Sequence, residues 1–147
     1  MSRRLDDLDA QFKPIAFELL ARTVEAGIPV MIINTRRTTA EQAIYLSTGA
    51  SSVQHSKHQD GLAIDVCPYS QWLEFGEDKL QWCADDPQWP KLGAIGEALG
   101  LRSGRRWKDP HDPGHFEMLL PGERYKDIPR TSAAWAMHGI PGGGGNV

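Results

Sequence analysis

The feature that most constrains this chain is a pair of polar motifs that lie far apart in the sequence. The first, residues 56–65, reads Ser-Lys-His-Gln-Asp-Gly-Leu-Ala-Ile-Asp, and the second, residues 112–117, reads Asp-Pro-Gly-His-Phe-Glu. The first motif runs from a polar loop into a short apolar strand at 62–66, and the second runs from a Pro-Gly turn into a strand at 115–120. The chemistry of the two motifs requires a fold that brings them together.

Three residues of these motifs, His58, Asp65 and His115, would supply two imidazoles and one carboxylate. Zinc accepts such a set and keeps a fourth position for water, as in catalytic rather than structural sites. Asp112, three residues before His115, is then available as a base. Non-haem iron enzymes use the same ligand types, so the residues alone leave the metal open between zinc and iron.

Two alternatives involve the segment around the second motif. His111 and His115 are four residues apart, as in a helical zinc-protease motif. Pro113 and Gly114 lie between them and argue against a regular helix. We therefore predict that His115 is the ligand and that His111 lies in a loop or at the rim of the site. Asp109 remains a competitor for the role of base.

A third polar element lies where a predicted strand, residues 29–34, leads into a predicted helix. Thr38 and Glu41 form a capping-box pattern, and Gly49 can end the helix. The arginine just before this helix, Arg37, can bind a carboxylate or stabilise an oxyanion through its rigid fork of donors. Without the two motifs, an arginine exposed at a helix start would be the preferred interpretation.

The remaining pattern predicts helices packed on a small antiparallel sheet, an α+β fold. Helices are expected at 14–26 and 89–99, a strand or turn at 101–107, and an irregular insertion with one helical turn at 69–88. The face of the first helix is predicted from four apolar residues: Ile15, Leu19, Leu20 and Val24. The length of 147 residues fits one domain, 1–147, with a flexible C-terminal tail at 139–147.

Charge and composition exclude several classes of partner. A formal net charge of −3 gives no global attraction to nucleic acid or to anionic membranes. The cluster Arg102, Arg105 and Arg106 is interpreted as solvated surface. No signal peptide and no membrane span are expected. Cys67 is expected to be buried, and its pairing with Cys83 is left open. Core packing is expected for most of the five tryptophans.

Together these motifs resemble those of the M15 family of zinc peptidases. The pattern Ser-x-His-x-x-Gly-x-Ala-x-Asp is matched by Ser56, His58, Gly61, Ala63 and Asp65. The pattern Glu/Asp-x-x-His is matched by Asp112 and His115, and an upstream Arg-Ser/Thr-x-x-x-Gln element by Arg37, Thr38 and Gln42. The run Arg-Thr-x-Ala-Glu-Gln, followed by Tyr45, Leu46 and Gly49, is similar to the phage branch of the family.

The resemblance implies a Hedgehog/D,D-peptidase-like fold and a role for each site residue. His58, Asp65 and His115 would hold Zn²⁺, Asp112 would be the general base and then the proton donor, and Arg37 would polarise the scissile carbonyl. Ser56 and Gln42 would support the substrate or the metal shell. From the residues themselves, Glu117 is either a partner of a metal ligand or a solvated strand residue, and Trp107 is suspected of touching substrate.

The function expected from the resemblance is hydrolysis of peptidoglycan stem peptides, at the L-alanyl-D-glutamate bond, by a monomeric phage or prophage endolysin. Such an enzyme would be made in the host cytoplasm and would reach the wall through a separate pore-forming protein. The alternatives are a D,D-carboxypeptidase or dipeptidase of the same family, and a zinc-binding virion or wall-recognition module without turnover.

Overall fold

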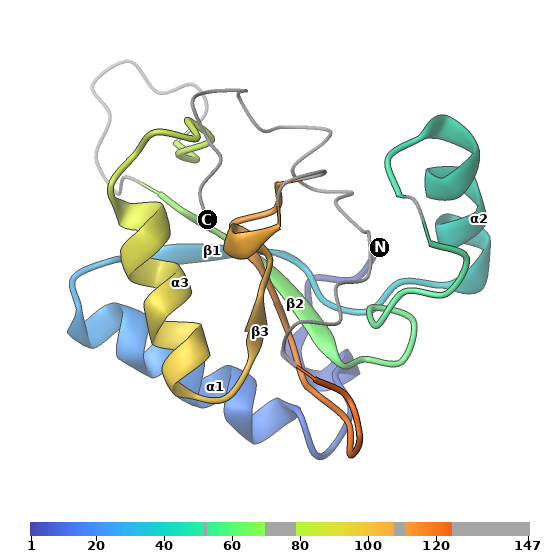
Figure 1. The fold of residues 1–147 in the computed structure, drawn as a ribbon, viewed down its shortest axis with the longest axis horizontal. Helices are drawn as coiled ribbons and strands as arrows, with labels where there is room; N and C mark the ends of the chain where they lie inside the picture. The colour runs from blue at the N-terminus through green and yellow to red at the C-terminus, as the bar shows by residue number, and fades with distance from the viewer. Residues whose placement is uncertain (52, 70–78, 108–110, 125–147) are drawn as a thin grey trace.

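The computed structural model describes residues 1–51, 53–69, 79–107 and 111–124 (Figure 1). This part of the chain contains η1 (Leu5–Asp7), α1 (Lys13–Glu25), β1 (Val30–Asn34), α2 (Thr39–Thr48), β2 (Ala63–Pro68), α3 (Gln88–Ala98), β3 (Arg102–Ser103), η2 (Gly104–Arg106) and β4 (His115–Glu117). The strands form one antiparallel sheet in the order β1-β2-β4-β3. The predicted α+β class with a small antiparallel sheet is confirmed.

The start of α2 is fixed by a complete capping box. The Thr38 hydroxyl accepts a hydrogen bond from the Glu41 amide at 3.1 Å, and the Glu41 carboxylate accepts one from the Thr38 amide at 3.0 Å. Both donors would otherwise be unpaired in the first turn of a helix. Gly49, with φ of 80°, ends the helix as predicted. The capping box therefore determines where the helix begins, immediately after Arg37.

The buried face of α1 consists of Ala16, Leu19 and Thr23, with the predicted Ile15 and Leu20 partly buried beside it, and it excludes the predicted Val24. Val24 is 71 % exposed, whereas Thr23 is buried and its hydroxyl donates to the Leu20 carbonyl at 2.8 Å. Thr23 lies four residues after the buried Leu19 and therefore on the same helix face, while Val24 is rotated a further ~100° away from it. The sequence prediction was wrong for Val24 because it relied on the apolar residue type and gave too little weight to the position of Val24 around the helix axis.

The register of β2 against β4 separates the core from the polar motifs. Asp65 pairs with His115, and Ile64 pairs with Phe116. Because successive side chains of a strand point to opposite faces, the first pair lies on one face of the sheet and the second pair on the other. Ile64 and Phe116 belong to the hydrophobic core, so the opposite face carries the site.

The core lies between this sheet and the two helices α1 and α3, which contact each other and lie apart from α2 (Figure 1). Cys67 is buried in this core, as predicted, whereas Cys83 is partly buried. Segment 101–107 contains both a two-residue strand and a 3₁₀ turn, and β4 stops at Glu117, short of the predicted end. Of the predicted insertion, residues 70–78 lie outside the described residues, as does the predicted tail.

Gly61, inside the first motif, provides a test of this local structure. Its φ is 71°, and a Cβ added there would lie 2.7 Å from the Asp9 backbone nitrogen. We expect Gly61→Ala to lower the free energy of unfolding by about 3 kcal/mol, because a left-handed conformation and a backbone clash add together. Gly27→Ala, at a φ of 73° with no atom within 4 Å, should cost only about 1 kcal/mol.

Urea denaturation followed by circular dichroism gives both free energies. Equal losses in the two variants would show that the segment around Asp9 moves away without cost.

Candidate metal centre

Three side chains converge on the polar face of the sheet. His58 comes from the loop before β2, Asp65 from β2 itself and His115 from the adjacent strand β4. One potential ligand atom of each lies within 4.8 Å of the others, and all three side chains are buried. The structure therefore brings together the three residues that the sequence predicts as metal ligands.

The hydrogen bonds of His58 leave one ring nitrogen available for a metal. Its Nδ1 lies 2.7 Å from the carbonyl oxygen of Thr35, which can only accept, so Nδ1 is the donor. Its Nε2 then carries a lone pair, is buried 3.2 Å from Asp65 Oδ2, and has no hydrogen-bond partner among the described residues. A buried polar atom without a partner is costly, and a metal ion at this point would satisfy it.

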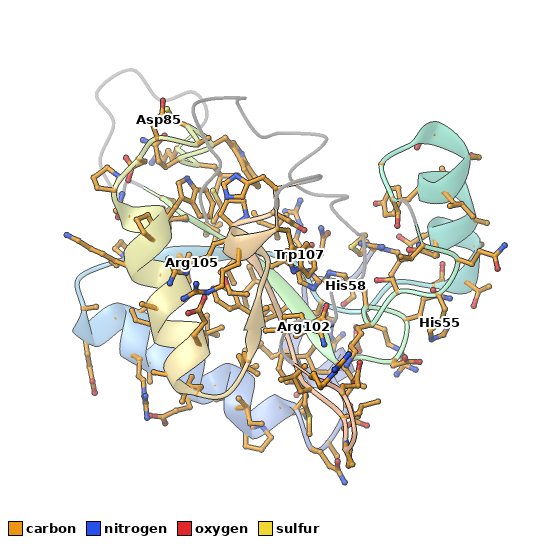
Figure 2. All side chains as sticks on the ribbon, in the orientation of Figure 1. His55, His58, Asp85, Arg102, Arg105 and Trp107 are labelled. Carbon is orange, nitrogen blue, oxygen red and sulfur yellow. The ribbon has the colours of Figure 1, made fainter. Side chains whose placement is uncertain are left out.

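The His115 ring is oriented so that Nδ1, rather than Nε2, faces the other ligands. Its Nε2 lies 2.7 Å from Glu117 Oε1, and its Nδ1 lies 3.0 Å from Asp65 Oδ1. The Trp107 ring, which is 2 % exposed, lies with its centroid 5.0 Å from that of His115. Figure 2 shows Trp107 and His58 together near the middle of the molecule. A hydrogen bond from Nε2 to Glu117 fixes the ring so that Nδ1 faces the other ligands.

Asp65 is the carboxylate of the cluster and is positioned by a neighbouring strand. Asn34, at the irregular end of β1, donates from its amide to Asp65 Oδ2 at 3.2 Å. Burial by itself would raise the pKa of Asp65, but the neighbouring imidazoles of His58 and His115 hold it well below its usual range. Asp65 is therefore kept in the charged form that a metal requires.

Asp112 lies beside the ligands rather than among them. Its Oδ2 is 3.9 Å from His115 Nδ1, and its amide donates to the Gly104 carbonyl at 3.2 Å. A Cβ at Gly104 would lie 2.1 Å from the Asp112 carbonyl oxygen, so only glycine permits this approach. Burial raises the pKa of Asp112 well above its usual range, and the charge of Asp65 adds to the rise.

A dication held by the three ligands would oppose that rise and favour the ionised form of Asp112. The ligand types, the unpartnered nitrogen of His58 and this uncompensated carboxyl all fit zinc. Asp109, the other predicted base, lies outside the described residues. His111 is half-buried and does not belong to the three-residue cluster.

Arg37 lies close to the same centre and is almost fully buried. One NH₂ group donates to Gln42 Oε1, whereas Nε and the other NH₂ group have no hydrogen-bond partner in the part of the chain that the structure describes. Its guanidinium carbon lies 4.7 Å from the centroid of the Tyr45 ring, a cation–π arrangement. Burial lowers the pKa of Arg37, and the negative charge of Asp65 opposes this effect. Two donors of Arg37 are thus available to an oxygen acceptor.

Two predicted supporting residues hold the segments around the site. Gln42 donates to Ser51 Oγ at 3.0 Å and to the Val53 carbonyl at 2.6 Å, so it ties α2 to the following loop. Ser56 Oγ accepts from the His58 amide at 3.2 Å and thereby shapes the turn that carries this ligand. Both residues are buried, and their observed contacts are with the protein framework.

One correction concerns Arg102. The sequence interpretation placed it on a solvated surface with Arg105 and Arg106, yet its side chain is 1 % exposed and donates to Glu117 Oε2 at 3.1 Å. Arg105 and Arg106 instead pair with Glu97. A run of basic residues carries no periodic signal, and only the pairing of β3 with β4 reveals that Arg102 lies opposite Glu117.

The protonation of His115 leads to a prediction about metal binding. Burial by itself would lower the pKa of His115, but hydrogen bonds to Asp65 and Glu117 raise it to about 10 in the absence of metal. His115 is therefore protonated at pH 7.5, and zinc must displace that proton. We expect zinc binding to release at least about one proton, and the apparent affinity to rise roughly tenfold from pH 6.5 to 7.5.

Calorimetry in buffers of different ionisation enthalpy measures this proton release. Repeating it with Asp112→Asn removes any contribution from Asp112. Binding without proton release in that variant would show that His115 is neutral in the apoprotein.

Comparison with known proteins agrees with this geometry. A peptidase M15 family model, described as D-alanyl-D-alanine carboxypeptidase, matches residues 49–118, the segment that carries both motifs. The L-Ala D-Glu endopeptidase ChiX of Serratia marcescens has a similar structure, with a TM-score of 0.62, 19 % identity, and coverage of 78 % of this chain and 83 % of ChiX.

A second similar structure is that of a variant of the vancomycin-resistance D,D-pentapeptidase VanY, from a VanB-type resistance cassette, in complex with Zn(II). Its TM-score is 0.50 and its identity 18 %, with 77 % of this chain and 73 % of that chain covered. At such identities these likenesses establish the fold. The family model covers both ligand motifs, and the fold brings those ligands into one cluster, so over this segment the chain is similar to the M15 family of zinc peptidases.

Proposed function

We propose that this protein is a zinc peptidase that hydrolyses peptidoglycan stem peptides, and that the bond it cleaves is L-alanyl-D-glutamate. The observation that carries the proposal is the grouping of three kinds of residue on one buried polar face. These are the metal-ligand cluster, an adjacent carboxyl that is not a ligand, Asp112, and a buried arginine with unpartnered donors, Arg37. Peptide hydrolysis requires a nucleophile, a base and charge stabilisation, and this grouping can supply all three.

His58, Asp65 and His115 would hold the zinc ion, which supplies Lewis-acid activation of water and of a carbonyl oxygen. Asp112 acts as the general base: it takes a proton from the attacking water and later returns it to the leaving amine. Its position supports this role, because the carboxyl lies 3.9 Å from a ligand nitrogen and is not itself one of the three ligands.

Arg37 is proposed to bind the carbonyl oxygen on which negative charge develops. Its free Nε and NH₂ donors form part of a planar fork, and Gln42 together with the Tyr45 ring holds the guanidinium in place. A donor that is already oriented stabilises the developing charge without a cost of reorganisation. Trp107 contacts His115 and exposes little surface, which leaves it little area for contact with a substrate.

The choice of bond is supported by the structural likeness to an L-Ala D-Glu endopeptidase and by the phage-like residues that surround Arg37. The second candidate, a D,D-carboxypeptidase, is supported by the description of the matching family model. We propose further that the protein is a phage or prophage endolysin, a monomer that is made in the host cytoplasm and reaches the wall through a separate pore-forming protein. No helix within the described residues has the length and apolar character needed to cross a membrane.

The decisive experiment is mass spectrometry of purified Gram-negative peptidoglycan after digestion, with and without a chelator. New N-terminal D-glutamate that disappears with chelator and returns with zinc is the expected result. Release of terminal D-alanine alone would assign the second candidate instead. No cleavage by zinc-loaded protein would favour a non-catalytic wall-recognition or virion module.

A further inference from the structure

The polar face of the sheet continues beyond the metal ligands into a buried network of charged residues. Glu117 is fully buried, and its two carboxylate oxygens have different partners. Oε1 lies 2.7 Å from Nε2 of His115, whereas Oε2 accepts a hydrogen bond from Arg102 NH1 at 3.1 Å. Rotation of the carboxylate would therefore break one contact or the other.

Arg102 is itself held in a fixed position. Arg102 lies opposite Glu117 in the pairing of β3 with β4, and its second NH₂ group donates to the Arg124 carbonyl at 2.8 Å. An arginine with both ends of its fork engaged has little freedom to reorient. Figure 2 shows Arg102 in the same central region as His58 and Trp107.

Lys57 approaches the same carboxylate from the first motif. Its Nζ lies 4.0 Å from Glu117 Oε2, donates to the Met118 carbonyl at 2.6 Å, and pairs with Glu123. Lys57 precedes the ligand His58, so this contact links the loop of one ligand to the strand of the other. The contact of Lys57 with Glu117 is longer than that of Arg102 with Glu117, and we expect it to contribute less to the position of the carboxylate.

From these contacts we propose that Arg102 is a positioning residue for the metal site: it orients His115 through Glu117. Arg102 holds the Glu117 carboxylate, the carboxylate accepts a hydrogen bond from Nε2–H of His115, and the ring then presents Nδ1 toward Asp65 and His58. Partners of metal-ligating histidines are worth roughly 10- to 100-fold in metal affinity. This inference rests on the zinc site of the proposed function and adds to it a residue that touches neither metal nor substrate.

The test compares zinc dissociation constants, measured by competition with a chromophoric chelator, for the full chain and its variants. Arg102→Met removes the guanidinium but keeps a long apolar side chain, and we expect zinc to bind about tenfold more weakly. Arg106→Met is the matched control, because Arg106 pairs with Glu97 away from the site, and its zinc affinity should equal that of the wild type. The Nε2–H signal of His115 in ¹⁵N NMR of the zinc-loaded protein should shift in the first variant only.

A double-mutant cycle then separates positioning from general loss of structure. If Arg102 acts through Glu117, Arg102→Met should change zinc affinity by less than about twofold when Glu117→Gln is already present. If Arg102→Met does not fold, Arg102→Lys replaces it, since lysine keeps the charge but cannot engage both partners, and we expect about threefold weaker binding.

Unchanged affinity in the folded Arg102 variant, or an equal loss with and without Glu117→Gln, would overturn the inference alone. A wild-type chain that binds no zinc would overturn the proposed function as well.

Discussion

Replacement of Asp112 by asparagine is expected to reduce turnover by about 100- to 10,000-fold while the protein keeps its zinc. Asparagine has nearly the same shape and leaves the backbone bond to Gly104 intact, but it cannot take a proton from water. Asp112 is not one of the three clustered ligands, so metal content should stay at one zinc per chain. The measurements are the rate of muropeptide cleavage and the zinc content of the same sample.

The matched control for this variant is Asp109→Asn, which changes the same residue type in the same segment of the chain. We expect it to retain near wild-type turnover. If Asp109→Asn lost activity while Asp112→Asn kept it, the roles of the two residues would be reversed, and Asp112 would be only a buried neighbour of the ligands.

The metal cluster could be predicted from the sequence because both motifs are short, and each one determines the local backbone structure that carries its ligands. The alternation of β2 places Asp65 and Ala63 on one face, and a Pro-Gly turn in the second motif leads directly into β4 at His115. Once the two strands pair, the register Asp65–His115 follows from the requirement that Ile64 and Phe116 enter the core. The capping box at Thr38 predicted α2 for the same reason, since every partner lies within one helical turn.

What the sequence could not predict depends on long-range pairing. Arg102 lies between Leu101 and Ser103 in a segment without a clear alternation of polar and apolar residues, and nothing local indicates that a two-residue strand will place it opposite Glu117. The bond from Asn34 to Asp65 requires the irregular end of β1, which has no sequence signal of its own. The contact between the Arg37 guanidinium and the Tyr45 ring, which belongs to α2, likewise has no sequence signal of its own. These residues determine how the predicted ligands are oriented rather than which residues they are.

Because some residues supply the metal-binding atoms and others only orient them, variants of the two kinds should behave differently. Loss of a ligand residue removes a metal-binding atom, whereas loss of Arg102 or Asn34 leaves every metal-binding atom present. Such a loss changes only how the ligand side chain is oriented. Ligand variants should therefore abolish metal binding, and variants of the supporting residues should weaken it in a graded way.

The largest such effect is expected for His58→Ala, which should bind no stoichiometric zinc and show no turnover. Wild-type protein in zinc at roughly 1,000 times its Kd should gain about 4 kcal/mol of stability, and a chain of this size should then melt about 10 °C higher. His58→Ala should show no such gain, because Asp65 and His115 alone offer only two of the three donors. Thermal melts of apoprotein with and without zinc measure the difference.

His55→Ala is the matched control, since His55 lies in the same loop and is the same residue type. Its side chain is 64 % exposed and pairs with Asp60 at 2.9 Å, outside the ligand cluster (Figure 2). We expect it to keep both the zinc and the thermal shift. A His58→Ala protein that still bound one zinc per chain would place the metal elsewhere, and loss of zinc from His55→Ala would show that the whole loop, rather than one imidazole, determines binding. Retention in His55→Ala with loss in His58→Ala would assign the metal to the Nε2 atom that the fold leaves buried and unpartnered.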